Sequence, residues 1–397
     1  MLKMNTHPRS ATLPELAALG PAAAAAVRDL LRQCPAYRPT PLLDLPRLAQ
    51  ELGLAQLAVK DESQRFGLGA FKALGGIYAV LRLGQDYAAA RLQRTPHMAE
   101  LLDGSLRELM RGLTMVCASA GNHGKAVAAG CRLLGCRALI YVHRSVRPCR
   151  LEAIRAQGAE VRQLDLGYDD AVAQAGADAR AHGYVLVSDT AGPGGDRVTG
   201  WVMQGYTALI DEALEQLPQP PTHVFVQAGV GGLAGAAAAY LAAARATVAT
   251  RVIVVEPRRA ACLLHNADAA VPARIAAEAP SVMSMLDCRE PSLLAWRVLR
   301  ETAYAYLAVE EDEAVHAVRR WAAPSDGDPR LLAGASGATG LAGLLHAGAR
   351  APMREALGLD AAARVLLINS EGPNDTQAFT EQTGLSVVWP AQASMHA

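Results

Sequence analysis

This chain of 397 residues lacks an excess charge of either sign. Lysine and arginine together number 38, and so do aspartate and glutamate, so the formal net charge is zero. Proteins that bind nucleic acid usually carry a basic face that neutralises phosphates. The balanced charge therefore argues against a nucleic-acid partner. The length is sufficient for two domains with a substantial core.

Long hydrophobic runs and an export signal are also missing. The uncharged segment 226–244 is mostly glycine and alanine, which offer too little apolar area to favour a bilayer. The first 33 residues lack the order of a charged, an apolar and a cleavage region. We therefore expect a cytoplasmic protein that does not enter a membrane.

The seven cysteines are scattered, and no C-x-x-C pair is matched by a second one. This pattern supports neither a zinc site nor the disulfide framework of a small domain. We therefore expect no metal, and thiols in the reduced state.

Short apolar runs that alternate with helical stretches dominate the chain. Eight runs have the length and composition of buried strands: 57–60, 113–117, 137–142, 159–164, 184–187, 222–227, 251–255 and 364–368. The alternation predicts an α/β protein with largely parallel sheets covered by helices on both faces.

Two polar stretches, 84–100 and 192–197, carry no strand pattern and are candidates for crossings between domains. Four of the expected strands lie between them. The sequence thus predicts a smaller α/β domain at 85–195, inserted in a larger domain formed by 1–84 and 196–397.

Lys72 lies near the start of a mostly apolar helix expected at 70–83. Burial there would lower the pKa of its amine and keep it nucleophilic, as Schiff-base chemistry requires. An isolated lysine is more often part of a solvated face, so this interpretation depends on the neighbouring motifs.

Segment 119–124, Ser-Ala-Gly-Asn-His-Gly, precedes an alanine-rich helix. Backbone N–H groups at a helix N-terminus suit a carboxylate or a phenolate oxygen, although such a turn is often only a helix cap. His123 alone is more typical of a structural residue. Ser370, just after the strand at 364–368, could donate to a ring nitrogen or merely cap a turn.

A glycine loop, Gly229-Val-Gly-Gly-Leu-Ala-Gly235, follows the strand at 222–227. Its N–H groups can close on a phosphate at the start of the next helix. The loop also satisfies G-x-G-x-x-A, with Glu256 ending the next strand, so an NAD-dependent dehydrogenase is an alternative. Its late place in the chain weakens that alternative.

Taken in this order, the motifs resemble fold type II pyridoxal-phosphate enzymes, built like threonine dehydratase and tryptophan synthase β, and above all the diaminopropionate ammonia-lyase family. The resemblance covers nearly the whole chain. Its phrases are Tyr37-Arg-Pro-Thr-Pro-Leu, Lys60-Asp-Glu-Ser-Gln-Arg-Phe-Gly-Leu, Gly121-Asn-His-Gly, Tyr168-Asp-Asp-Ala-Val, Asp189-Thr-Ala, Trp201-Val-Met-Gln-Gly-Tyr, Glu290-Pro, Leu294-Ala-Trp and Ser336-Gly-Ala.

This resemblance implies pyridoxal 5'-phosphate as the cofactor, held covalently by Lys72, with Asn122 at its ring oxygen and Ser370 at its pyridine nitrogen. Five loop residues would hold the phosphate: Gly229, Val230, Gly231, Gly232 and Leu233. Ser119, Ala120, Gly121, Asn122 and His123 would bind the substrate. A hydroxyl at the ring nitrogen makes a weaker electron sink than a carboxylate and suits β-elimination.

The related lyases have two acidic residues near the substrate, of which this chain keeps Asp189 and has Ala120 at the other place. The resemblance makes Asp189 a candidate base or a binder of the β-amino group, and implies loss of activity on the D-isomer. Ala335 and the segments 192–197 and 284–286 also depart from the family. Cys262 and Cys288 flank a loop leading to the substrate region, where a disulfide is conceivable although free thiols are expected.

The resulting prediction is a lyase that converts a small β-substituted L-amino acid, with L-2,3-diaminopropionate as the leading candidate, to pyruvate and ammonia. Lys72 or Asp189 would remove the α-proton. A serine or threonine dehydratase is the alternative, favoured by Ser119-Ala-Gly-Asn. A further alternative is a catalytically silent binding protein, but the presence of Lys72 and Asn122 makes an enzyme the better interpretation. Relatives suggest a homodimer.

Overall fold

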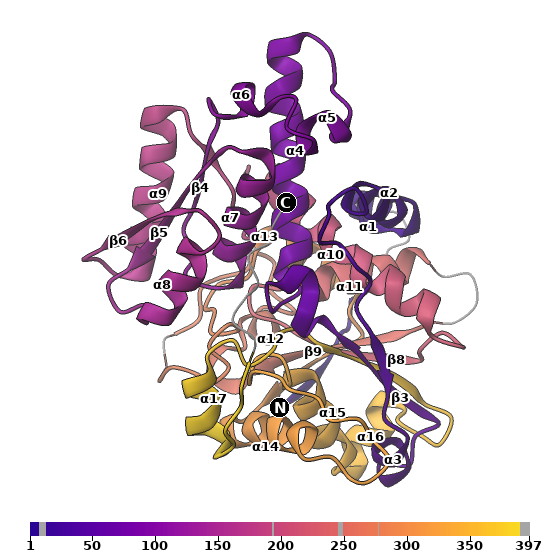
Figure 1. Cartoon of the computed structure of the whole chain (residues 1–397). Helices are drawn as coiled ribbons and strands as arrows, with labels where there is room; N and C mark the ends of the chain where they lie inside the picture. The colour runs from indigo at the N-terminus through magenta and orange to yellow at the C-terminus, as the bar shows by residue number, and fades with distance from the viewer. Residues whose placement is uncertain (8–12, 193, 245–248, 277, 390–397) are drawn as a thin grey trace. The chain divides into compact units, whose positions relative to one another are not determined.

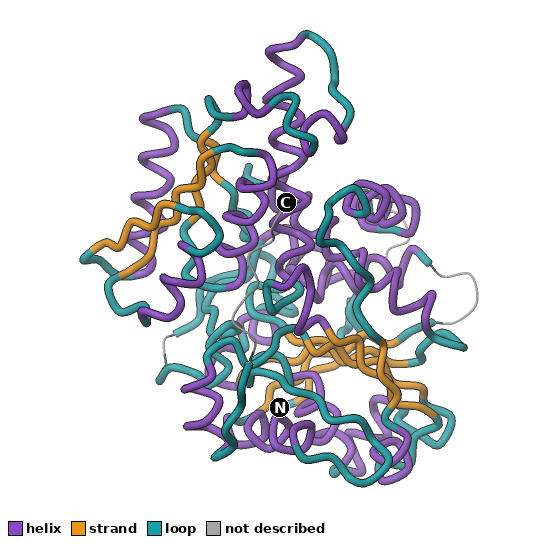
Figure 2. Tube along the Cα trace, in the orientation of Figure 1, coloured by secondary structure: helices purple, strands orange, loops and turns teal. Residues whose placement is uncertain are grey.

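A computed structural model describes residues 1–7, 13–192, 194–244, 249–276 and 278–389. The chain divides into two compact units. The first comprises Met1–Ala24, Pro39–Gln64 and Tyr206–Trp389, and the second comprises Ala25–Arg38 and Arg65–Gly205 among the described residues. The sequence prediction of an α/β protein with largely parallel sheets is confirmed, and each unit has its own sheet (Figure 2).

The first unit is built on a seven-stranded sheet in the order β1-β10-β9-β8-β11-β3-β2. The strands are β1 (Leu2–Met4), β2 (Leu42–Asp44), β3 (Gln56–Asp61), β8 (His223–Gln227), β9 (Arg251–Pro257), β10 (Ala305–Val309) and β11 (Arg364–Asn369). Only the edge strands β1 and β2 pair in an antiparallel way. Central strands such as β8 are buried along their whole length, as expected where helices cover both faces.

Helices lie on both sides of this sheet (Figure 1). On one side α11 (Gly232–Ala243) packs against β8 and β9, and on the other α15 (Thr339–Gly348) packs against β8 to β11. The remaining helices that lie wholly within this unit are α1 (Pro14–Leu19), α3 (Pro46–Glu51), α12 (Cys262–His265), α13 (Leu293–Thr302), α14 (Glu311–Ala322), α16 (Ala351–Leu357), α17 (Thr376–Thr383) and the 3-10 turn η2 (Arg258–Ala260).

The second unit is built on a four-stranded parallel sheet in the order β6-β5-β4-β7. Its strands are β4 (Thr114–Cys117), β5 (Arg137–His143), β6 (Glu160–Leu164) and β7 (Val185–Leu186). Its helices are α4 (Lys72–Leu92), α5 (Met98–Leu102), α6 (Arg107–Met110), α7 (Asn122–Leu134), α8 (Pro148–Arg155) and α9 (Tyr168–His182). The chain passes from one unit to the other within three further elements, α2 (Pro21–Leu31), the turn η1 (Glu62–Gly67) and α10 (Asp196–Gln216), and also between Arg38 and Pro39.

Helix α4 packs along α7, and glycines let the two backbones approach closely. A Cβ on Gly76 would lie 2.5 Å from the Cβ of Ala126, and one on Gly130 would lie 2.9 Å from the Cβ of Val80. This packing brings α4 into the second unit, whose longer segment begins at Arg65, whereas the sequence prediction places the start of the smaller domain at residue 85. Helix α4 continues to Leu92, into the stretch 84–100 that the sequence offered as a crossing between domains.

All eight expected strands are present, and the structure adds three that the apolar pattern did not reveal. β1 and β2 have three residues each and lie at the sheet edges, where burial is partial. β10 is fully buried, but its sequence AYLAV reads equally well as part of a helix. Within the described residues, no helix is long and apolar enough to span a membrane.

Candidate active site

Lysine is scarce in this chain, and three of its four lysines have structural roles. Lys60 is fully buried and pairs with Glu212 at 2.9 Å. Lys125 is buried and donates to a backbone carbonyl at 3.1 Å. Lys3 pairs with an aspartate at the surface. Lys72 is only partly buried, with about a quarter of its side chain exposed, and it lies beside Asp189 and His123.

Lys72 is the first residue of α4 and forms an ion pair with Asp189, from the loop after β7. Burial alone would raise the pKa of the Asp189 carboxyl, but the Lys72 ammonium and, to a smaller extent, His123 outweigh it, so the pKa lies below its usual range. Cys117, at the end of β4, is buried close enough for Asp189 and Lys72 to influence its pKa, which burial raises. The structure therefore gathers an amine and an ionised carboxylate at the ends of β4 and β7.

His123, near the start of α7, is buried beside this pair. Its Nε2 lies 3.1 Å from the Val187 carbonyl oxygen. Because a carbonyl only accepts, Nε2 must carry the proton, and Nδ1 presents a lone pair. Burial lowers the pKa of the imidazole, which keeps the ring neutral, while Asp189 opposes this shift. Nδ1 is buried without a hydrogen-bond partner among the described residues.

The segment Ser119–Gly124 forms a tight turn into α7. Gly121 N donates to Ser119 Oγ at 3.3 Å, and a Cβ on Gly124 would lie 2.1 Å from the Ser119 carbonyl oxygen. The N-cap residue of α7, Gly121, has no side chain to accept from the first turn. A helix start of this kind suits an anion, which is the role that the sequence suggested for it. Ala120, between these residues, adds no titratable group.

In the first unit, Gly229, Val230 and Gly231 form the turn between β8 and α11. Gly231 has φ +101, a conformation that only glycine adopts readily, and a Cβ there would lie 3.1 Å from the Cβ of Ala295. A Cβ on Gly229 would lie 3.0 Å from Cys288 Sγ and 3.2 Å from Leu286 Cα. The two glycine positions of this turn therefore leave little room for a Cβ, and the turn precedes a twelve-residue helix that begins at Gly232. It has the features of a phosphate cradle.

Ser370 follows β11 in the same unit, and its side chain is 3 % exposed. Its Oγ accepts a hydrogen bond of 2.7 Å from Gln227 Nε2. Gln227 is the residue that sequence reasoning missed. The available signal was a polar residue that ends an otherwise apolar strand directly before the glycine loop.

Glu256 is not placed as a ribose ligand of a dinucleotide would be. It is fully buried, and its two oxygens accept from the N–H groups of Leu263 and Leu264, at 2.8 Å each. Burial raises the pKa of its carboxyl to about 8. Its partners are thus the backbone of α12, which argues against the dehydrogenase alternative.

Cys262 and Cys288 are thiols outside any disulfide, and both lie beside Gly229. Cys262 Sγ donates to the Gly229 carbonyl oxygen at 3.5 Å, while Cys288 Sγ lies where a side chain at Gly229 would be. Burial raises the pKa of the Cys262 thiol well above its usual value. The pair therefore packs against the glycine turn as two reduced side chains.

The structure also shows the contacts of the three parts of the chain that depart from the family pattern. Ala335 is buried, and its carbonyl accepts from Thr339 Oγ1 at 2.9 Å. Ser336 Oγ accepts from the backbone N–H of Met285, at 3.1 Å, in the departing segment 284–286. In segment 192–197, of which residue 193 lies outside the described residues, Arg197 pairs with Asp86 and stacks on a tryptophan ring.

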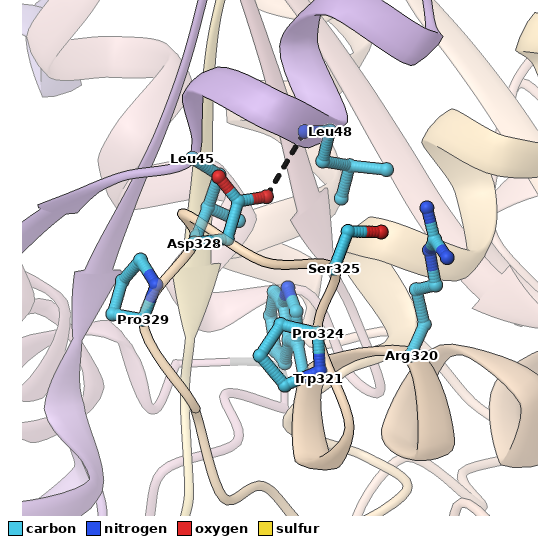
Figure 3. Close-up of a pocket in the computed structure, with 8 residues that line it drawn as sticks. All are labelled: Leu45, Leu48, Arg320, Trp321, Pro324, Ser325, Asp328 and Pro329. Carbon is cyan, nitrogen blue, oxygen red and sulfur yellow. Dashed lines mark hydrogen bonds between the residues drawn. The ribbon is translucent and has the colours of Figure 1, made fainter.

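A small pocket in the first unit is lined by other residues (Figure 3). Leu45, Leu48 and Trp321 form its apolar part, and Asp328 accepts from Leu48 N at 2.9 Å. None of the candidate site residues lines it. Among the described residues, no group of three or more His, Cys, Asp or Glu side chains could hold a metal ion.

Comparison with known proteins places these features in context. Residues 34–371 match the family described as pyridoxal-phosphate dependent enzyme. The chain is 37% identical to the diaminopropionate ammonia-lyase of Salmonella typhimurium over 91% of each protein. It is 30% identical to the biosynthetic L-threonine dehydratase of Mycobacterium leprae, but over 59% of this chain and 47% of that protein.

The fold is also shared with a solved structure. The diaminopropionate ammonia-lyase of Escherichia coli, crystallised with an aminoacrylate–PLP azomethine reaction intermediate, matches with a TM-score of 0.85 and 33% sequence identity, covering 96% of each chain.

Proposed function

Because this chain belongs to the family of pyridoxal-phosphate dependent enzymes and, within it, to the diaminopropionate ammonia-lyases, we propose that it converts L-2,3-diaminopropionate and water to pyruvate and two molecules of ammonia. The observation that carries this proposal is the contact between the Lys72 amine and the Asp189 carboxylate. It joins the two groups that the reaction needs, a primary amine that can hold the cofactor and an anion that can hold an ammonium.

The residues present fit pyridoxal phosphate. Lys72 supplies the amine, the turn with Gly229 and Gly231 leads directly into the N-terminus of α11, where N–H groups suit a phosphate, and Ser370 supplies a buried hydroxyl. When bound, this cofactor supplies an aldehyde that condenses with primary amines and a ring that delocalises negative charge from Cα. We assign the phosphate to the N–H groups of residues 229–233, the ring oxygen to Asn122 and the ring nitrogen to Ser370.

Lys72 is the proposed proton acceptor at the substrate Cα, because its amine is the accessible base of the second unit's site. Once this amine is no longer an ammonium, the main influence that lowers the Asp189 pKa is lost and burial is left to raise it. Asp189 then becomes a better proton acceptor. While ionised, it can bind the β-ammonium of the substrate.

The N–H groups at the start of α7, within Ser119–His123, are assigned to the substrate carboxylate. Neutral His123 adds an acceptor without a positive charge, since its Nε2 proton is directed to Val187 O. It therefore does not compete with the ammonium groups of the substrate for Asp189.

The experiment is a product balance on the purified holoenzyme. L-2,3-diaminopropionate should give one pyruvate and two ammonia, whereas L-serine or L-threonine would give one ammonia per keto acid. A dehydratase with a distant relationship to this chain is thus separated from an ammonia-lyase in one assay. Keto acid formed faster from serine than from diaminopropionate would contradict the proposal.

A homodimer remains a prediction. Light scattering coupled to size-exclusion chromatography tests it directly, because it measures the mass of the particle in solution.

A further inference from the structure

We infer that Gln227 is a positioning residue that fixes Ser370 as a hydrogen-bond donor and so keeps the cofactor's pyridine nitrogen unprotonated. The inference rests on the proposed function, in which Ser370 faces that nitrogen. It adds a residue and a direction of hydrogen bonding to that assignment.

The orientation of the Gln227 amide is set by two backbone carbonyls. Nε2 lies 2.9 Å from the Gly337 oxygen and 2.9 Å from the Ile368 oxygen. Since carbonyl oxygens only accept, the nitrogen end of the amide must point to them. The same nitrogen lies 2.7 Å from Ser370 Oγ. An amide nitrogen has no lone pair to offer, so Ser370 Oγ is the acceptor in this contact, and one of the two N–H protons is shared between two of the three acceptors.

The Ser370 proton must therefore be directed elsewhere. The hydroxyl is 3 % exposed, and its described hydrogen bonds include no acceptor for the proton. A buried donor without an acceptor is unfavourable, so the hydroxyl favours a ligand atom with a lone pair. An unprotonated pyridine nitrogen is such an atom. A protonated one would donate to Ser370 and leave the hydroxyl proton without a partner.

Burying the Gln227 side chain is unfavourable because only the nitrogen of its amide forms hydrogen bonds within the described part of the chain. This suggests that the nitrogen has a specific role. Its Oε1 is buried with no hydrogen-bond partner among the described residues. The side chain is 2 % exposed, in a strand whose neighbours Val224, Phe225 and Val226 are apolar. An apolar residue would avoid this unsatisfied acceptor, and such local conflicts are expected at functional sites.

Both residues of the Gln227–Ser370 hydrogen bond are fixed in position by their neighbours. β8, which ends at Gln227, pairs with β11, which leads to Ser370. Next to Ser370, Asn369 Nδ2 donates to Asp61 Oδ1 at 2.8 Å and to the Leu332 oxygen at 3.1 Å. Neither partner of the Gln227–Ser370 contact can therefore turn away easily, and the direction of the hydrogen bond is built into the fold.

The test uses holoenzyme reconstituted with pyridoxal phosphate that carries ¹⁵N in the ring, whose chemical shift reports protonation of the ring nitrogen. The wild type should show an unprotonated nitrogen from pH 6 to 9. Gln227→Glu offers a carboxylate that accepts the Ser370 proton, so the nitrogen should become protonated within this range. Gln227→Met removes the donor and should weaken cofactor binding on the order of tenfold, measured by titration of the apoenzyme.

A double-mutant cycle separates positioning from general damage. In a Ser370→Ala background, Gln227→Met should have little further effect on the ring-nitrogen shift or on cofactor affinity, because the two residues act as a unit. Gln157→Met, at another fully buried glutamine, is the matched control and should leave the shift unchanged. If Gln227→Glu does not fold, the double-mutant cycle with Gln227→Met still tests whether Gln227 acts through Ser370.

Two results would overturn the inference: a protonated ring nitrogen in the wild type, or strictly additive effects of the two substitutions. Failure of the proposed function would look different, since the wild type would then form no Lys72-linked cofactor and no pyruvate from diaminopropionate.

Discussion

The Lys72 amine and the Asp189 carboxylate are in direct contact although 117 residues separate them along the chain. Each changes what the other can do. The ammonium keeps the carboxylate ionised in a buried setting, and the carboxylate holds the amine at the start of α4. Chemistry that consumes the ammonium therefore also raises the pKa of the carboxyl, which couples the two groups during a reaction.

Replacing Lys72 with alanine should abolish cofactor that borohydride can attach to the protein. The other three lysines are paired or buried, so none of them can easily take its place. Mass spectrometry of peptides after reduction locates the adduct. Lys3→Ala, at the surface, is the control and should retain full labelling. An adduct retained on another lysine in Lys72→Ala would contradict the assignment.

Glu256 should make the stability of the protein depend on pH. Its pKa is about 8 in the folded state, against about 4.3 in an unfolded chain. Between these values the folded protein binds a proton that the unfolded chain does not, so the contribution is fully present below about pH 4 and is lost as the pH rises through 8.

Glu256→Gln lacks this titration. Relative to the wild type, it should therefore gain unfolding free energy, on the order of a few kcal/mol, as the pH rises from 5 to 9. Urea unfolding of both proteins at pH 5 and at pH 9 measures how the difference between their unfolding free energies changes with pH. Glu108→Gln, at an exposed glutamate, should show no such change. Parallel pH dependence of the wild type and Glu256→Gln would show that the carboxyl titrates normally.

The sequence revealed the fold class because the buried strands of parallel sheets are continuous apolar runs. The phrases around Lys72 led to its proposal as the cofactor lysine, and the structure places Asp189 beside it. Gln227 was not recognisable, because its role depends on Gly337, Ile368 and Ser370, which meet it only after β8 and β11 pair. The end of α4 was missed because residues 84–92 are polar, although tertiary packing on α7 favours the helix.

Cys262 and Cys288 should both be alkylated when the protein is denatured without reductant. Neither takes part in a disulfide in the structure. In the native protein Cys262 should react slowly, since burial raises its pKa and the thiolate is the reactive form. Cys149, which is exposed, is the internal standard for a fast thiol. Mass spectrometry that finds Cys262 and Cys288 joined in one peptide pair would refute the prediction of free thiols.

The last prediction concerns stereochemistry and follows from the contrast between Asp189 and Ala120. Removal of an α-proton needs a base within hydrogen-bond reach on the side to which that proton points, and two enantiomers present it to opposite sides. Lys72 and Asp189 lie together, whereas Ala120 has no titratable group. General-base catalysis is typically worth about 100-fold to 10,000-fold, so the preference for the L-isomer should reach at least that range.

Two substitutions test this account through turnover and cofactor binding measured on the same preparations. Asp189→Asn should lower turnover of L-2,3-diaminopropionate much more than it weakens binding of pyridoxal phosphate, because the amide keeps the shape but not the charge. Ala120→Asp should admit the D-isomer, since it restores an acid within the turn that precedes α7. Comparable rates on D- and L-2,3-diaminopropionate in the unmodified enzyme would show that the two positions do not determine stereochemistry.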